Sequence, residues 1–248
     1  MIYETVILGS GYFSLGYASS HDKTLIIEET QLLDPHFFGT LSGFSMSVGD
    51  ICAKGEKALL ESFVDEGVIA DGRVAVNELE PALCRFVECQ MPDILLGSFC
   101  SDIRKTDNGY EVEICNNEGV SRVLANRVID TRLPAGNKIN LLLAVNAENL
   151  PKAEGLQPAF YSDQAVVSLE FDSPCDINEA KSRALNLLED TLRASGARIV
   201  CTSYRMFGAD KFAPYTDEKG VLHVDETNMG GIFAAYGKGE LFDDTFGS

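Results

Sequence analysis

The sequence predicts an α/β protein: a Rossmann-like parallel sheet with an inserted antiparallel β-meander, plus a smaller α+β lobe. Three observations predict this class. Apolar runs enclose a helical stretch near the start, short alternating segments separated by turns fill residues 99–131, and a further strand–helix–strand pattern follows residue 160. We expect residues 1–135 and 228–248 to form the larger domain and residues 136–227 the smaller lobe.

The first unit of the sheet is contained in "YETVILGSGYFSLGYASSHDKTLIIEET", residues 3–30. The apolar run before Gly9 predicts a buried strand, residues 12–20 a short helix, and residues 23–29 a second strand. Such a short strand–helix–strand connection implies parallel strands, because antiparallel neighbours need only a turn.

The turn between the first strand and the helix carries the spacing of a dinucleotide fingerprint. Gly9 and Gly11 would let backbone N–H groups at Tyr12 and Phe13 approach a pyrophosphate, and Ser14 stands where the fingerprint has its third glycine. One alternative stays open, in which the glycines serve only the packing of strand and helix.

Two acids follow the second strand. Glu28 lies seventeen positions after Gly11, where a carboxylate can accept hydrogen bonds from the hydroxyls of an adenosine ribose. Glu29 is its neighbour. In the alternative interpretation, both acids simply end the strand in solvent.

The middle of the chain supplies a loop, two helices and the meander. Residues 34–50 are expected to form an ordered loop, since their aromatic side chains require burial. Helices are expected over 56–67 and 77–91, the second opened by a capping box of Asn77 and Glu80. The meander then precedes the apolar strand 126–131.

The smaller lobe and the tail come last. We expect strands over 165–171 and 197–207, and between them a helix over 176–196 that is capped by Asp176. The tail at 230–244, "GGIFAAYGKGELFDD", is expected to form an apolar strand and a glycine turn.

Three stretches resemble the FAD-binding two-domain oxidoreductases of the glutathione-reductase-like superfamily, which includes flavin-dependent amine and amino-acid oxidases. They are "VILGSGYFSLGYA" with "LIIEE", then "ILLGSFCSDI" with the meander and "NRVIDT", and finally "GGIFAAYG". The resemblance implies that FAD lies with its pyrophosphate at Gly9, Gly11 and Ser14, its ribose at Glu28 and its adenine near Cys100.

The resemblance also implies an activity: hydride transfer between a small molecule and the flavin. By the same resemblance Gly39 and Thr40 would belong to the family's loop beside the flavin ring, with a plain surface turn as the alternative. Where the family has a glycine after "VIDT", this chain has Arg132, and it lacks the family's aspartate after the late glycine. A second hypothesis is therefore a non-catalytic member that serves in sensing or partner binding. A simple nicotinamide-dependent dehydrogenase is disfavoured, because its sheet would continue with further strand–helix units instead of a meander.

Other candidate residues are isolated. His36 is a candidate general base, with a structural role as the alternative. Tyr204 and Arg205 end a strand of the smaller lobe, where an arginine can hold a substrate carboxylate or simply pair at the surface. The sequence contains no pattern typical of a catalytic triad or a phosphate-binding lysine loop, and no metal site is predicted.

Composition limits the class of partner. The formal net charge of −18 disfavours nucleic acid and anionic membranes. The seven cysteines contain no C-x-x-C pair, which is typical of free thiols in a reducing compartment. With no signal-peptide pattern and no apolar run long enough for a bilayer, we expect a cytoplasmic protein. The sequence predicts neither the substrate nor the oligomeric state.

Overall fold

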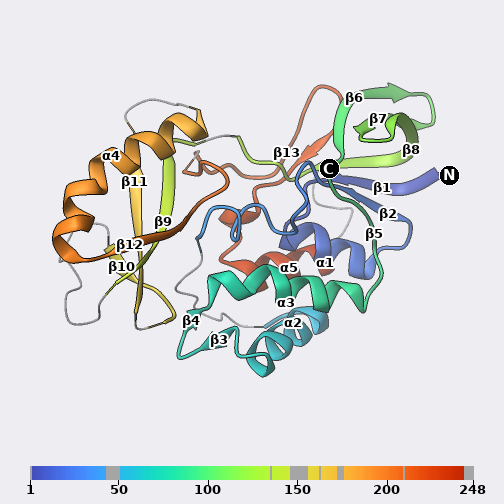
Figure 1. The fold of residues 1–248 in the computed structure, drawn as a ribbon. Helices are drawn as coiled ribbons and strands as arrows, with labels where there is room; N and C mark the ends of the chain where they lie inside the picture. Colours follow the sequence, from blue (N-terminus) through green and yellow to red (C-terminus); the bar gives the residue numbers. More distant parts are fainter. Residues whose placement is uncertain are drawn as a thin grey trace.

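The chain forms two lobes, each built on its own sheet (Figure 1). The computed structural model describes residues 2–42, 51–134, 136–145, 156–161, 163–171, 176–208 and 210–242. The larger lobe contains helices α1, α2, α3 and α5, and the smaller lobe contains α4. The predicted fold class is confirmed.

The larger sheet has the order β13-β14-β8-β1-β2-β5, with β6 and β7 extending from β8. Its strands are β1 (Ile2–Leu8), β2 (Thr24–Ile27), β5 (Asp93–Leu95), β6 (Phe99–Thr106), β7 (Gly109–Asn116), β8 (Gly119–Asp130), β13 (Tyr215–Thr216) and β14 (Leu222–His223). β1 pairs in parallel with both β2 and β8, while β6, β7 and β8 form the antiparallel meander.

The apolar run of β1 is buried because both faces of the sheet are covered. Ile7 packs with the helices, in the same core as Phe13 of α1. Its neighbours Val6 and Leu8 face the other way and pack with Val112 of the meander strand β7. This alternation places the carboxyl end of β1, and the turn that follows it, between helices and meander.

The helices of the larger lobe lie together on one side of the sheet (Figure 1). They are α1 (Tyr12–Ser20), α2 (Lys54–Asp65), α3 (Val76–Glu88) and α5 (Ile232–Glu240), with a short hairpin of β3 (Ile69–Ala70) and β4 (Arg73–Val74) between α2 and α3. A 3-10 turn, η2 (Glu226–Asn228), precedes α5.

The strand predicted for the tail is wrong, since this segment forms α5. A short apolar run of this kind does not distinguish a buried strand from a buried helix. α5 packs directly on α1, because each helix presents a glycine to the other: a side chain at Gly16 would collide with Tyr236 O, and one at Gly239 with Phe13 O. The absence of two Cβ atoms thus sets the approach of the two backbones.

Two further expectations require correction. The last meander strand and the apolar strand after it are one continuous strand, β8, whose first half pairs with β7 and whose second half pairs with β1. The capping box at Asn77 is wrong, because α3 already begins at Val76 and the amide of Asn77 donates to the side chain of Glu78.

The smaller lobe is an antiparallel sheet of order β10-β11-β9-β12 that carries one helix. Its elements are β9 (Lys138–Ala144), β10 (Leu156–Pro158), β11 (Gln164–Glu170), α4 (Ile177–Ser195) and β12 (Arg198–Thr202). Asp176 caps α4 as predicted, accepting a hydrogen bond from Asn178 N at 2.8 Å. β11 and β12 run parallel on either side of β9, as expected for a strand–helix–strand unit.

The two lobes are joined by more than the chain. Asn140 of β9 donates from Nδ2 to the carbonyl oxygens of Thr40 (3.0 Å) and Leu41 (3.1 Å) in the larger lobe. The division at residues 136 and 228 stays a prediction, although β13 and β14, which lie before residue 228, pair with the larger sheet.

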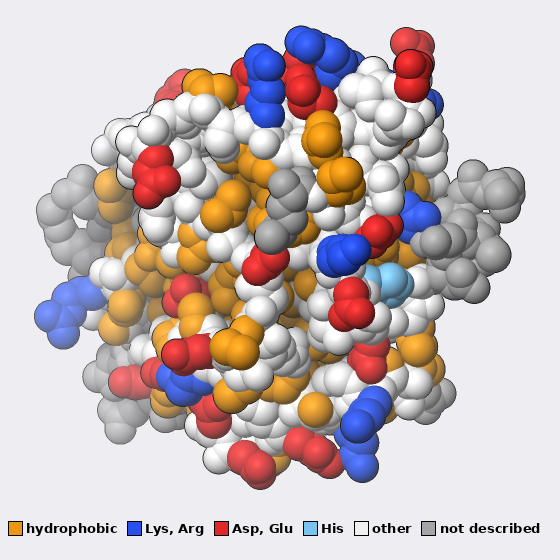
Figure 2. All heavy atoms as spheres, turned by 90° about the vertical axis from the view of Figure 1, so that its right-hand side faces the viewer, with side chains coloured by type: hydrophobic (Ala, Val, Ile, Leu, Met, Phe, Trp, Pro, Cys, Tyr) orange, Lys and Arg blue, Asp and Glu red, His pale blue; other side chains and the backbone are white. Residues whose placement is uncertain are grey.

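The surface carries many acids and scattered apolar groups. On the face in Figure 2, Asp and Glu side chains are dispersed among uncharged and apolar ones. No helix in the described ranges is long and apolar enough to cross a membrane. None of the six cysteines among the described residues forms a disulfide, while Cys175 and the loop residues 43–50 lie outside these residues.

Candidate functional site

The glycine turn leads from β1 into α1, and side chains of other segments pack directly against it. Gly9 has φ +103°, which an L side chain rarely adopts, and a Cβ there would lie 2.5 Å from Thr131 Oγ1. Gly11 is the N-cap of α1 in an extended conformation, and a Cβ on it would collide with the carboxylate of Glu226. The glycines therefore create a cradle, and Glu226 fills it.

Glu226 acts as the anion at the start of α1. Its side chain comes from η2 and is fully buried, and its Oε2 accepts a hydrogen bond from Phe13 N at 3.0 Å. Gly11 itself has no side chain with which to cap the helix. A carboxylate here stabilises the positive end of the helix dipole, which is the role a phosphate has in dinucleotide-binding proteins.

His36 holds the other oxygen of this carboxylate. Its Nδ1 is hydrogen-bonded to Glu226 Oε1, and the ring is almost completely buried. His36 Nε2 has no hydrogen-bond partner among the described residues. Because a carboxylate only accepts, Nδ1 carries the shared proton, which leaves Nε2 of a neutral ring as an acceptor.

Asp34 and Tyr12 complete a buried polar cluster beside this pair. The Asp34 carboxylate accepts from Phe37 N and Phe38 N. Burial raises the pKa of Asp34 well above its ordinary value, and the charge of Glu226 raises it further. Burial also raises the pKa of Tyr12, with Asp34 and Glu226 adding to the effect. A further negative charge in this cluster would be strongly disfavoured.

Ser14 faces the sheet instead of the turn. It is fully buried, and its hydroxyl lies 3.2 Å from Thr131 Oγ1, which in turn donates to Leu8 O at 2.9 Å. The serine thus ties α1 to the residue that follows β8. Its predicted place at a pyrophosphate stays a prediction.

Glu28 lies beside the glycine turn, as its position in the sequence suggested. The side chain is 3% exposed; Oε2 accepts from Ser10 N (3.0 Å) and Ser10 Oγ (3.1 Å), and Oε1 accepts from Thr30 N (2.8 Å). The two bonds from Ser10 join the end of β2 to the turn after β1, and the bond from Thr30 N closes the local turn after β2. They are structural bonds that need no ribose.

This arrangement gives a stability prediction. Glu28→Ala should lower the free energy of unfolding by about 2–3 kcal/mol without any ligand, since two buried donors of Ser10 and the half-buried Thr30 N–H lose their Glu28 acceptor. Glu29→Ala is the matched control: Glu29 is half exposed and contributes one ion pair to Arg132, so about 0–1 kcal/mol should be lost. Urea unfolding of both variants would measure this, and equal losses would contradict the structural role of Glu28.

Arg132 crosses the end of β1. Its Nε and Nη2 bind both oxygens of Asp130 (2.9 and 2.8 Å), and its Nη1 lies 3.0 Å from Glu29 Oε1. β1 lies between β8 and β2 in the sheet, so this bridge passes over the turn at Gly9. The hydrogen bonds to Asp130 raise the pKa of Arg132 further above its ordinary value.

The two loop candidates from the sequence meet each other. The carbonyl oxygen of Gly39 accepts from Tyr204 N (2.7 Å) and Arg205 N (3.3 Å). Thr40 is buried, Tyr204 is 57% exposed, and Arg205 is half-buried. Cys100 lies apart from this contact on β6, and burial raises the pKa of its thiol.

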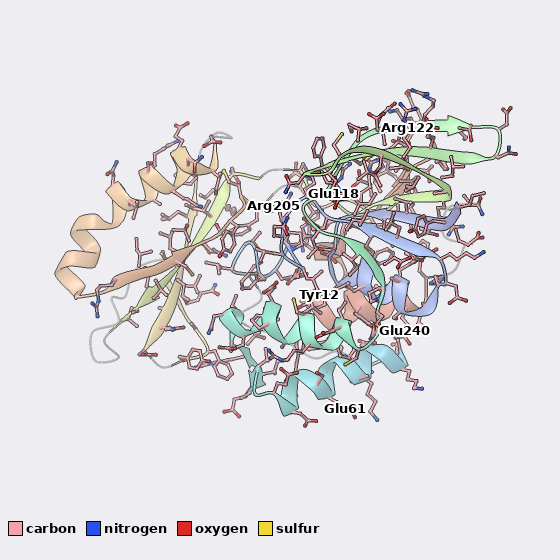
Figure 3. All side chains as sticks on the ribbon, turned by 45° about the vertical axis from the view of Figure 1, so that its right-hand side comes forward. Tyr12, Glu61, Glu118, Arg122, Arg205 and Glu240 are labelled. Carbon is pink, nitrogen blue, oxygen red and sulfur yellow. The ribbon has the colours of Figure 1, made fainter. Side chains whose placement is uncertain are left out.

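A cavity of about 270 Å³ lies beside the meeting point of these loops. It is lined by residues of the loop 36–42, by 133–134 after β8, by 205–208 and 210–211, and by Asp225 and Thr227. Figure 3 places Arg205 between the two lobes. The cavity and the glycine turn are connected by one residue pair: His36 lines the cavity, and its ring is hydrogen-bonded to Glu226 at the turn.

Sequence reasoning did not identify Glu226, Asp34 or the cavity. The only signal for Glu226 was an acidic pair, Asp225-Glu226, between the apolar segment 221–224 and the double glycine that opens α5. Its contact with Phe13 joins residues 213 positions apart, which no local pattern predicts.

No family model and no curated protein matches this sequence. The fold is similar to that of p-nitrophenol 4-monooxygenase PnpA from Pseudomonas putida DLL-E4 (TM-score 0.59, 11% identity, 96% of this chain, 77% of that chain). It is also similar to aklavinone-11 hydroxylase in a complex with FAD and aklavinone (0.54, 11%, 96%, 60%) and to L-proline dehydrogenase from P. horikoshii (0.57, 10%, 97%, 92%). The chain spans only 55–60% of the length of several similar hydroxylases.

At this identity the comparisons show the fold, which is shared by monooxygenases, hydroxylases and dehydrogenases, one of them crystallised with FAD. The glutathione-reductase-like subgroup stays a prediction. The side chains do not fit FAD as they stand, because Glu226 occupies the cradle at Gly11 and Arg132 bridges to Glu29 over the turn. A diphosphate would have to displace a buried carboxylate.

Proposed function

We propose that this protein is a non-catalytic member of the FAD-binding fold that binds a small molecule in the cavity between its lobes. The observation that carries the proposal is the bond from Phe13 N to Glu226, at the point where the resemblance implies a pyrophosphate. The chain's own carboxylate accepts from this helix terminus, so the terminus needs no dinucleotide phosphate to do so.

Displacing Glu226 would be costly. The carboxylate is fully buried and bonded to both Phe13 N and His36, and charge-assisted bonds of this kind contribute about 1.5–3 kcal/mol each. A diphosphate in its place would bring negative charge next to Asp34, whose pKa is already raised by burial and by Glu226. Opening the adenosine side would additionally break the pair of Arg132 and Glu29.

The test is an FAD titration of the purified protein. We expect the protein to be colourless and to leave flavin fluorescence and absorbance unchanged, with any FAD affinity weaker than about 0.1 mM. Dialysis against FAD followed by gel filtration gives the same answer without a spectroscopic assumption. A protein that purifies with bound flavin, or binds FAD at micromolar concentration, would contradict the proposal.

A second candidate is the FAD-dependent oxidoreductase of the resemblance, transferring hydride between a small molecule and the flavin. It is favoured by the shared fold and by the strand–turn–helix unit with Gly9 at positive φ. This function requires a conformation in which Glu226 and Arg132 have left the turn. Micromolar FAD binding in the titration above would favour this candidate over the first.

A further inference from the structure

Arg205 carries a half-buried side chain for which the described part of the chain supplies no acidic partner. Its backbone N–H donates to Gly39 O, but its side chain makes no hydrogen bond or ion pair with any residue in the described ranges. Other arginines of the chain are paired with carboxylates: Arg85, Arg104, Arg122, Arg132 and Arg183. In a chain with 38 acids and 20 bases, a partly desolvated cation left unpaired indicates an anionic ligand.

The cavity that Arg205 lines suits a small molecule with an apolar body. Five apolar residues contribute to the walls: Phe37, Leu133, Pro134, Met206 and Phe207. Its volume of about 270 Å³ is near the lower end of ligand pockets. At about 30 Å³ for each water displaced, this space holds on the order of ten non-hydrogen atoms.

The other polar residues of the cavity include two acids, of which Asp210 is exposed to solvent. Asp225 already accepts from Thr227 N, Thr227 Oγ1 and Phe212 N, so its carboxylate has a structural role. Lys211 donates to Thr227 O over a long 3.4 Å and adds positive charge. His36 also lines the cavity.

We infer that the cavity binds a small organic acid, whose carboxylate pairs with Arg205 and whose apolar body packs between Phe37 and Phe207. This inference rests on the proposed function in treating the cavity as the ligand site, and it gives that site its chemical class.

The test compares phenylacetate with its neutral isostere phenylacetamide by isothermal titration calorimetry at low ionic strength. We expect phenylacetate to bind at least tenfold more tightly, because only its carboxylate forms a charge-assisted pair with Arg205. Arg205→Gln should weaken phenylacetate binding about 10- to 100-fold and leave phenylacetamide unchanged, while Arg205→Lys should restore part of the affinity. Arg198→Gln, at an exposed arginine of β12, is the control and should change neither.

The outcomes separate this inference from the proposed function. Equal binding of acid and amide, an unchanged affinity in Arg205→Gln, or no binding of phenylacetate would each overturn the carboxylate site. If the protein also binds FAD tightly, the proposed function fails while the carboxylate site stands. If it binds neither FAD nor phenylacetate, the carboxylate site fails, while the proposal that Glu226 keeps a dinucleotide out of the glycine turn stands.

Discussion

Glu226→Ala should lower the free energy of unfolding by about 3–5 kcal/mol and create an anion site where there was none. The substitution leaves the N–H of Phe13 and the buried Nδ1–H of His36 without their acceptor, and each buried donor left unsatisfied costs about 1–3 kcal/mol. The same change empties the cradle above Gly11, so a free anion can reach the start of α1.

The second part of this prediction is rescue. Pyrophosphate should stabilise Glu226→Ala, by about 2.7 kcal/mol at a concentration one hundred times its dissociation constant, and should not stabilise the wild-type protein. Urea unfolding with and without pyrophosphate measures both effects. FAD should bind best when the bridge over the turn is also removed, in the double variant Glu226→Ala and Arg132→Gly.

Glu240→Ala provides a matched control. Glu240 accepts from Gly55 N (2.7 Å) and Glu56 N (3.2 Å) at the start of α2, so it is also a carboxylate at a helix N-terminus. There the Glu56 carboxylate remains, bonded to Cys52 N and Ala53 N, and would repel an incoming anion. Pyrophosphate should therefore not rescue this variant. Rescue of both variants, or of neither, would show that Glu226 does not stand in for a phosphate.

Gly16→Ala should destabilise the larger lobe by about 2–4 kcal/mol. The new methyl group would collide with Tyr236 O of α5, which is backbone and cannot swing away. The two helices would have to separate, loosening the packing of Phe13 and Tyr236 in the main core. For a chain of this size the loss corresponds to a fall in Tm of about 5–15 °C, measurable by differential scanning calorimetry.

Gly67→Ala is the control for this substitution. Gly67 has φ +72°, and nothing lies within 4 Å of a Cβ placed on it, so only backbone strain of about 1 kcal/mol is expected. A loss at Gly16 no greater than that at Gly67 would contradict the close approach of α1 and α5.

The first 30 residues were predictable because each of their signals is local. An apolar run ending at a glycine, a short helix and a second apolar run give β1, α1 and β2 in the correct order and direction. The meander was equally predictable from alternation and turns. The segment 232–240 was not, since Ile232 and Phe233 are buried in a helix with the same uniform apolarity that a central strand would have.

The candidate site was predictable in position but not in chemistry. Glu28 and the glycines of the turn lie together, as their spacing required, and the loops at Gly39 and Arg205 are in contact. Which groups occupy the glycine turn is decided by the side chains of Arg132 and Glu226, which are distant from the turn in the sequence. Their role follows from the assembled tertiary structure, which places η2 over the start of α1, and not from any pattern within a single segment.

The Glu226 carboxylate that accepts from Phe13 N competes with any free anion for the glycine turn. A group attached to its own site by the chain acts at an effective concentration of about millimolar or more, however dilute the protein is. A free diphosphate at micromolar concentration with a comparable intrinsic affinity would therefore occupy the turn in only a small fraction of molecules. The Glu226 carboxylate therefore outcompetes a free diphosphate at this turn because it is covalently part of the chain and cannot diffuse away.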